Sequence, residues 1–258
     1  MAERFLSIDG GNTRLKATLF TPQADAEVFV FAPGDAEGLL SLIERKGVES
    51  AAMAGVGHID GRLVESLRMV LDERFMLITP GIELPISVNY DDPRHLGLDR
   101  KATAVAAARE YPGFRCIVID AGTALTCDIV TPDGFMAGSI SPGLSMRFRA
   151  LHEFTAALPL VDSDGDLSSA QSFASSTEGA IRAGAVRGFV DEVAGAINRA
   201  AASYGITTAI ITGGNSNLIM ESLERGDNID LNVTRIIHDP HLLAKGIRVI
   251  YRHNENEI

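Results

Sequence analysis

A short pattern that occurs twice constrains the fold of this chain more than any other feature. Asp9-Gly10-Gly11-Asn12-Thr13 follows the apolar run Phe5–Ile8, and Asp120-Ala121-Gly122-Thr123 follows the apolar run Cys116–Ile119. Each turn leads into a second apolar run that ends in Thr-Pro, and each half then reaches a Pro-Gly corner. The repeat predicts two related halves, each of which opens with a strand, a glycine turn and a second strand.

The glycine turn at Asp9 has two possible explanations. Asp-Gly turns are common in ordinary β-hairpins. Alternatively, the glycines let backbone N–H groups approach a phosphate while the Asp9 carboxylate faces a cation. Because the second copy places Asp120 at an equivalent corner, two carboxylates would face one cleft between the halves. Such a cleft suits a nucleotide–metal complex.

The spacing of apolar residues predicts α/β structure in both halves. We expect the first half to contain three strands followed by a helix, a strand, a helix and a strand. The second half again opens with three strands, and it includes a long helix from Ser176 to Tyr204. An Ala-rich helix that begins near Asp99 is thin enough to pack close to a neighbour. With 258 residues the chain has room for two domains, which we place at residues 1–115 and 116–258.

Composition argues against several classes of function. The 34 acidic and 23 basic residues give a formal net charge of -11, which disfavours a general binder of nucleic acid or of anionic membranes. No apolar run is long enough to span a bilayer and no charged leader precedes one, so we expect neither membrane insertion nor export. Cys116 and Cys127 both lie in predicted strands, which favours reduced core thiols and a cytoplasmic location.

The common nucleotide-binding signatures are missing, since the sequence has no P-loop, no G-x-G-x-x-G after the first strand and no G-x-S-x-G. A third glycine turn, Thr212-Gly213-Gly214-Asn215, stands between a predicted strand and a helix. Its glycines could let the backbone lie against an adenine or a ribose, or they could form an ordinary strand–helix turn.

Asp99 and Arg100 stand in the first turn of the Ala-rich helix. The helix dipole favours Asp99 there, so it could be a cap or a base that accepts a proton from a substrate hydroxyl. The same dipole disfavours Arg100, which indicates an anionic partner such as a substrate carboxylate. Tyr90 could be an aromatic at a strand end, and Thr177 could cap its own helix. Lys16 lies within reach of the first glycine turn, although strand lysines are usually solvated.

Segments from nearly the whole chain together resemble the type III pantothenate kinase family. The specific part is Gly97-x-Asp99-Arg100 with Tyr90 seven residues before the glycine. The Asp-x-Gly turns mark only the wider superfamily of actin, sugar kinases and Hsp70-like ATPases. The matching segments are Asp9–Thr13, Tyr90–Arg100, Asp120–Thr123, Ser141–Gly143, Leu158–Pro159, Thr177–Gly184 and Thr212–Gly214.

The resemblance implies two ribonuclease H-like domains of the actin-like ATPase type, each a mixed sheet with three N-terminal strands flanked by helices. It implies ATP-dependent phosphorylation of pantothenate to 4'-phosphopantothenate, the first step of coenzyme A biosynthesis. It also implies a homodimer in which the substrate site is shared between subunits.

Residue roles carry over from the same resemblance. Asp99 would be the catalytic base, Asp120 would coordinate a monovalent cation, K⁺ or NH₄⁺, and Mg²⁺ would accompany the nucleotide. The implied ATP-binding residues are Asp9, Gly10, Gly11, Asn12, Thr13, Arg14, Leu15, Lys16 and Thr123. The implied substrate-binding residues are Tyr90, Gly97, Leu98, Asp99, Arg100 and Thr177, the last of these from the partner subunit.

Two alternative functions stay open. An actin-fold kinase could act on another small hydroxy acid or on a sugar, and it would then bind ATP without turnover of pantothenate. The chain could instead be a non-catalytic accessory factor in transcription, although a direct DNA binder should show a basic stripe and the sequence has none.

Overall fold

The computed structural model describes residues 4–11, 14–22, 26–55, 60–162, 173–225 and 230–255. Contacts between residues divide the chain into two compact units. The first unit consists of Met1–Pro112, Asp133–Phe135 and His241–Ile258, and the second consists of Gly113–Pro132 and Met136–Pro240. Each unit is built around one of the two halves that the sequence repeat predicts.

A five-stranded mixed sheet forms the centre of the first unit, with the strand order β3-β2-β1-β4-β5. β1 runs antiparallel to β2 and parallel to β4, and β4 runs parallel to β5. β1 and β4 are buried on both faces, which explains why their sequences are rich in apolar and small residues instead of alternating. The strands are β1 (Phe5–Gly10), β2 (Leu15–Phe20), β3 (Glu27–Phe31), β4 (Ser50–Gly55) and β5 (Phe75–Leu77).

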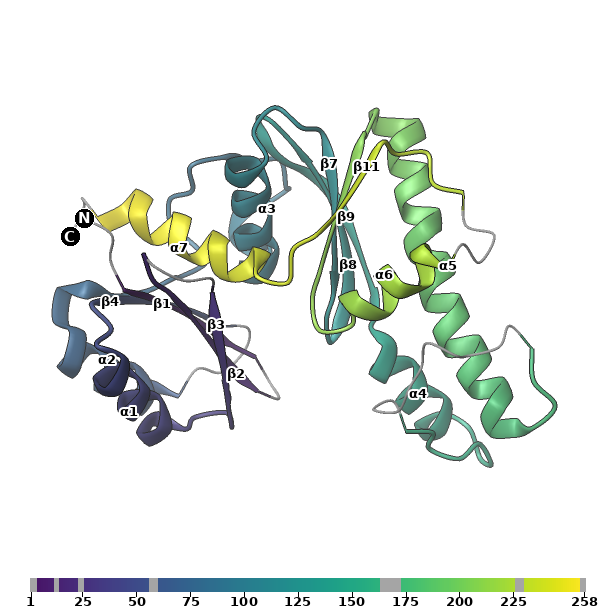
Figure 1. Cartoon of the computed structure of the whole chain (residues 1–258), viewed down its shortest axis with the longest axis horizontal. Helices are drawn as coiled ribbons and strands as arrows, with labels where there is room; N and C mark the ends of the chain where they lie inside the picture. Colours follow the sequence, from purple (N-terminus) through teal and green to yellow (C-terminus); the bar gives the residue numbers. More distant parts are fainter. Residues whose placement is uncertain are drawn as a thin grey trace. The chain divides into compact units, whose positions relative to one another are not determined.

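Two pairs of helices cover the two faces of this sheet (Figure 1). Leu6 and Ile8 pack with α1 and α2, whereas Phe5, on the opposite face of β1, packs with α3 and α7. This alternation follows from the two-residue period of a strand. The helices are α1 (Ala36–Lys46), α2 (Gly61–Leu71), α3 (Leu98–Glu110) and α7 (Leu242–Asn254).

The Ala-rich α3 packs closely against α7, as its sequence predicts. Gly246 of α7 lies so near α3 that a Cβ atom at this position would overlap the carbonyl oxygen of Ala102. This packing explains why the contacts assign His241–Ile258 to the first unit, although the sequence-based ranges group that segment with the second half. The division into domains at residues 1–115 and 116–258 stays a prediction.

The sheet of the second unit repeats the topology of the first. Its strand order is β11-β10-β7-β8-β9, with the short strand β6 (Ser87–Val88) added beside β9. β7 runs antiparallel to β8 and parallel to β10, as β1 does to β2 and β4. The predicted repeat of the opening strands is therefore present in the fold. The strands are β7 (Cys116–Ala121), β8 (Ala124–Thr131), β9 (Gly134–Pro142), β10 (Thr208–Thr212) and β11 (Arg235–His238).

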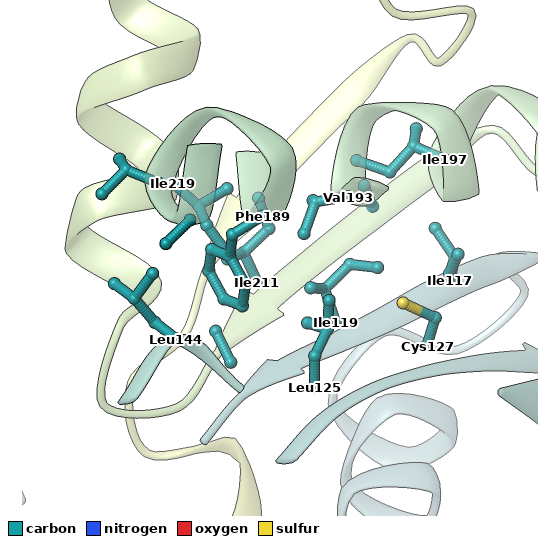
Figure 2. Packing of buried hydrophobic residues seen from close by; sticks show 14 of the residues in the cluster. Ile117, Ile119, Leu125, Cys127, Leu144, Phe189, Val193, Ile197, Ile211 and Ile219 are labelled. Carbon is teal, nitrogen blue, oxygen red and sulfur yellow. The ribbon is translucent and has the colours of Figure 1, made fainter. Parts of the chain in front are cut away.

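The core of the second unit lies between this sheet and three helices. Figure 2 shows Phe189, Val193 and Ile197 of α5 packed with Ile119 of β7 in one apolar cluster. Cys127 belongs to the same cluster, and burial raises the pKa of its thiol to about 12. This placement agrees with the buried core thiol that the sequence predicts. The helices are α4 (Leu144–Glu153), α5 (Thr177–Tyr204) and α6 (Ser216–Glu224).

Three short elements have no counterpart in the sequence-based prediction. β6 (Ser87–Val88) pairs in parallel with Gly134 and Phe135 at the start of β9, and two 3-10 helices span Asp72–Arg74 and Pro93–His95. Within the part of the chain that the structure describes, no helix combines the length and the hydrophobicity needed to cross a membrane.

Candidate active site

The first glycine turn stands at the end of β1, where Asp9 is paired across the sheet with Lys16 of β2. The N–H group of Gly11 donates to the carbonyl oxygen of Arg14 at 3.1 Å and closes the turn. The hairpin interpretation is therefore correct for the backbone, and it places a carboxylate and an ammonium side by side. The predicted ATP-binding residues of this turn differ in exposure. Partly exposed are Asp9, Gly10, Gly11 and Lys16, whereas Arg14 is exposed and Leu15 is buried. The other two, Asn12 and Thr13, lie outside the described residues.

Burial and two charged neighbours set the electrostatics of Asp9. Burial and then the negative charge of Asp99 raise the pKa of Asp9 from 3.8 to about 6, while Lys16 lowers it. A carboxylate held beside a second carboxylate favours a cation, which would offset both charges. The structure thus brings the predicted phosphate loop close to the predicted base, although the two are far apart in the sequence.

Asp99 lies in the first turn of α3, as predicted, and Gly97 is the N-cap of this helix. One carboxylate oxygen of Asp99 accepts a hydrogen bond from the N–H group of Arg100 at 2.8 Å. A Cβ atom at position 97 would overlap that same oxygen, so glycine leaves the space that the carboxylate occupies. Among the described residues no side chain caps this helix, so the structure does not place Asp99 as its N-cap. The hydrogen bond from Arg100 instead fixes the orientation of the Asp99 carboxylate within the first turn.

Arg100 is almost fully buried, and its guanidinium lies over two aromatic rings. Its Cζ atom is 5.3 Å from the ring centroid of Phe135 and 6.0 Å from that of Tyr90. The two rings meet edge to face with their centroids 6.0 Å apart. The structure thus brings together Tyr90 and Arg100, both predicted to bind substrate, and it adds Phe135, which the sequence analysis does not single out. The neighbouring Leu98 is buried in the core.

Lys101 is a second residue that sequence reasoning misses. Its side chain is 2% exposed, and its ammonium donates to the carbonyl oxygen of Pro80 at 2.6 Å. Burial lowers the pKa of Lys101, and the negative charge of Asp92 opposes this shift. Hydrogen bonds from Arg94 hold the pKa of Asp92 at about 2, so Asp92 is ionised at neutral pH. In the sequence, Lys101 stands between Arg100 and the Ala-rich part of the helix, with no feature that marks it as buried.

Three glycine corners meet at the end of β7 in the second unit. A Cβ atom at Gly143 would overlap the backbone oxygens of Gly122 and Thr123. A Cβ atom at Gly213, which has a φ of +92°, would overlap the side chain of Asp120. The segments that the sequence analysis treats separately therefore form one backbone cluster around Asp120.

Arg147 of α4 fixes the Pro-Gly corner of this cluster. Its Nε donates to the carbonyl oxygen of Pro142 at 2.9 Å, and its guanidinium also hydrogen-bonds to Glu192 of α5. Its Cζ lies 5.3 Å from the ring centroid of Phe189. Burial opposes ionisation of Glu192, but its hydrogen bonds and neighbouring positive charges outweigh burial and lower its pKa.

The remaining predicted residues lie at exposed positions of the second unit. Thr123 is exposed at the corner that carries Asp120. Thr177 is exposed at the start of α5, where Ser176, and not Thr177, caps the helix by accepting a hydrogen bond from Gly179 at 3.1 Å. The site residues thus form one group in each unit, and the expectation that the two groups face one cleft stays a prediction.

The chemistry of these donors fits the groups that a kinase requires. The Asp9 carboxylate is partly exposed and has a raised pKa, and carboxylate oxygens are preferred ligands of Mg²⁺. Asp120 lies beside a corner that carries the closely spaced backbone oxygens of Gly122 and Thr123, and such oxygens suit a hard cation.

Known proteins of similar sequence agree with one another. A family model described as type III pantothenate kinase matches residues 5–199. A type III pantothenate kinase from Porphyromonas gingivalis is 34% identical over 252 residues, which cover 96% of this chain and 98% of the relative. Another from Christiangramia forsetii is 31% identical over 255 residues, which cover 98% of this chain and 99% of the relative.

Solved structures of lower sequence identity show the same fold. A putative Baf family transcriptional activator from Campylobacter jejuni matches with a TM-score of 0.57 and 21% identity, covering 97% of this chain and 99% of that chain. A ROK family glucokinase from Streptomyces griseus, solved with glucose and AMPPNP, matches with a TM-score of 0.53 and 15% identity over the same shares of the two chains. These likenesses concern the fold alone. They confirm the predicted α/β architecture of the actin-like ATPase type, with two mixed sheets.

Proposed function

The chain belongs to the type III pantothenate kinase family, and from this premise we propose how its residues carry out the reaction. The enzyme is a phosphotransferase that uses ATP to phosphorylate pantothenate to 4'-phosphopantothenate in coenzyme A biosynthesis. The roles of individual residues, the ions and the subunit arrangement are the proposal.

Asp99 acts as the general base. The observation that carries this assignment is the placement of its carboxylate, which the N–H group of Arg100 orients and which interacts electrostatically with Asp9 of the phosphate loop. Asp99 accepts the proton of the primary hydroxyl of pantothenate while the hydroxyl oxygen bonds to the γ-phosphorus of ATP. The bond between that phosphorus and the bridging oxygen breaks, and ADP leaves.

Arg100 binds the carboxylate of pantothenate through its guanidinium. Its position at the start of α3 supports this assignment, because the helix dipole alone would disfavour a cation there and a bound anion offsets that cost. Tyr90 is 40% exposed and lies in the connector between β5 and α3, where its ring faces the guanidinium of Arg100. Gly97 and Leu98 contribute to the same substrate site through their backbone.

The turn from Asp9 to Lys16 holds the phosphates of ATP. Lys16 supports this assignment, because it supplies a positive charge directly across the sheet from Asp9. Thr123 contacts the nucleotide from the glycine cluster of the second unit. Asp9 would hold Mg²⁺ there, and the ion would offset negative charge on the transferred phosphoryl group.

Asp120 coordinates a monovalent cation, K⁺ or NH₄⁺. Asp120 is partly exposed, and its carboxylate lies beside Gly213 and Gly122 in the cluster that also carries the backbone oxygens of Gly122 and Thr123, which supports the assignment. Turnover of the purified enzyme should rise when Na⁺ is replaced by K⁺ or NH₄⁺ at constant ionic strength, and Asp120→Asn should remove this stimulation. Equal turnover in all three salts would contradict the cation site.

We propose a homodimer in which Thr177 of the partner subunit completes the substrate site. Large apolar side chains are exposed on the segment from β9 to the start of α5, and a second copy of the chain would cover them. We also place the enzyme in the cytoplasm, where thiols stay reduced, because both cysteines are free and buried. The exposed apolar residues are Ile140, Met146, Phe154, Leu160 and Phe173.

Subunit mixing tests the shared site. Asp99→Asn and Thr177→Val would each inactivate every site of their own homodimer. A mixed dimer would contain one site with both lesions and one site with neither, so mixing the two inactive proteins should restore activity. The mass in solution should correspond to two chains. No recovery after verified subunit exchange, or a monomeric mass with full activity, would contradict the shared site.

The experiment that tests the base is an Asp99→Asn substitution, assayed for ADP release with ATP, Mg²⁺, K⁺ and pantothenate. We expect kcat to fall about 10²- to 10⁴-fold while the protein stays folded. Asp91→Asn is the matched control, because Asp91 is an exposed aspartate on the same connector. Wild-type turnover by a folded Asp99→Asn protein would leave Asp99 as a structural residue of the helix start.

A further inference from the structure

Phe135 is placed to orient the side chains that we assign to pantothenate binding. Phe135 is 1% exposed, so its ring is buried and does not reach the surface. The guanidinium of Arg100 lies over this ring, 5.3 Å from Cζ to the centroid, and the ring of Tyr90 meets it edge to face. One side chain therefore contacts both proposed recognition residues.

The backbone holds Phe135 rigidly in this position. Its carbonyl oxygen accepts a hydrogen bond from the N–H group of Asn89 at 3.0 Å, and Phe135 is paired with Val88 of β6. The preceding Gly134 has a φ of +130°, and a Cβ atom there would overlap the backbone of Ser87. The start of β9 is thus fastened to the connector immediately before Tyr90.

The ring also contributes to the electrostatics of Arg100. A buried guanidinium in the first turn of a helix is disfavoured by burial and by the helix dipole. The negative face of an aromatic ring attracts such a cation, and a leucine of similar bulk would not. Phe135 therefore helps to keep the Arg100 guanidinium oriented before the substrate arrives, which reduces the entropy lost on binding.

We propose that Phe135 is a positioning residue for recognition of the pantothenate carboxylate, acting through Arg100 and Tyr90. This inference rests on the proposed substrate-binding role of Arg100. Because Phe135 does not touch the reacting atoms, its loss should weaken the binding of pantothenate and leave the transfer step unchanged.

The test compares Phe135→Leu with Phe5→Leu in the full-length enzyme. Phe5 is also 1% exposed and lies in the first unit, where its ring packs on Tyr251 with centroids 5.0 Å apart. For Phe135→Leu we expect the KM for pantothenate to rise about 3- to 30-fold, with kcat and the KM for ATP within about twofold of wild type. Phe5→Leu should lower Tm but leave all three kinetic parameters near wild type.

A neutral acceptor makes the readout specific to the carboxylate. Pantothenol carries a hydroxymethyl group in place of the carboxylate, so its use does not depend on Arg100. The ratio of kcat/KM for pantothenate to that for pantothenol should fall in Phe135→Leu by the same factor as the KM rises, and it should not fall in Phe5→Leu. An unchanged ratio in a folded Phe135→Leu protein would overturn the positioning role.

A second substitution decides the question if Phe135→Leu does not fold. Replacing Phe135 by 3,4,5-trifluorophenylalanine keeps the ring but removes most of its negative face, and the KM for pantothenate should again rise. A wild-type KM in that protein would overturn the inference. Absence of pantothenate turnover in the wild-type enzyme would be a different result, since it would overturn the proposed function itself.

Discussion

Asp9, at the end of β1, lies close enough to Asp99, in the first turn of α3, for the negative charge of Asp99 to add to burial in raising the pKa of Asp9 to about 6. The two carboxylates thus stand together before any ligand binds. Such a pair destabilises the ionised protein and favours a bound cation. The arrangement therefore links the stability of the free enzyme to pH.

Asp9→Asn should make the free enzyme more stable at neutral pH. A carboxyl group whose pKa is raised on folding binds its proton more tightly in the folded state. Its contribution to the stability of the fold is therefore fully present below pH 3.8 and is lost as pH rises through about 6. The loss is on the order of 3 kcal/mol at pH 7. Urea unfolding should show that the free energy of unfolding falls less between pH 4.5 and pH 7.5 for Asp9→Asn than for wild type. Equal declines would contradict the raised pKa.

Gly97→Ala should lower activity more than stability. The added Cβ overlaps a carboxylate oxygen of Asp99, which can swing away, so the free energy of unfolding should fall by only about 1 kcal/mol. A displaced base should reduce kcat by about tenfold or more. Gly61→Ala is the matched control, because Gly61 also stands at a helix start but has open space around its Cβ position. Wild-type kcat in Gly97→Ala would show that the orientation of Asp99 is not critical.

Gly213→Ala should disrupt the glycine cluster of the second unit. Alanine is strained at a φ of +92°, and its Cβ would overlap Asp120, so we expect a loss of about 2–4 kcal/mol and weaker ATP binding. The neighbouring Gly214→Ala is the control, since a Cβ atom there meets no atom within 4 Å. Thermal unfolding and nucleotide titration of both proteins measure the difference. Similar stability and similar ATP affinity in Gly213→Ala and Gly214→Ala would indicate that the backbone around Gly213 can relax.

Much of the fold follows from local sequence patterns. The repeated strand–turn–strand pattern predicts two sheets with the same opening strands because hairpin formation depends on neighbouring residues. The first turn of α3 could also be predicted, since charge preferences near a helix start act within one turn. These are the places where the predictions and the structure agree.

The residues that sequence reasoning misses depend on contacts between distant segments. In the sequence, Phe135 resembles any phenylalanine of a strand. It lies near Arg100 because it pairs with β6, and a strand of two residues has no periodicity from which it could be predicted. Lys101 is hidden because its partner is a backbone oxygen, that of Pro80. The packing of α7 on α3 likewise depends on Gly246, whose role is visible only once Ala102 lies against it.

Arg147→Met should loosen the Pro142-Gly143 corner and weaken ATP binding. The substitution removes the hydrogen bond to the Pro142 carbonyl oxygen and leaves Glu192 without this partner, which should cost about 1–3 kcal/mol. Because the pKa of Glu192 is lowered in the folded protein, ionised Glu192 stabilises the fold above its ordinary pKa of 4.5, and this stabilisation is lost as pH falls through the folded pKa. The difference in free energy of unfolding between wild type and Arg147→Met should therefore shrink in acid. Arg149→Met is the control, because Arg149 is exposed and pairs with Glu153 within one turn of α4, a contact expected to contribute less than about 0.5 kcal/mol. Equal effects of the two substitutions on stability and on the KM for ATP would show that Arg147 does not support the corner.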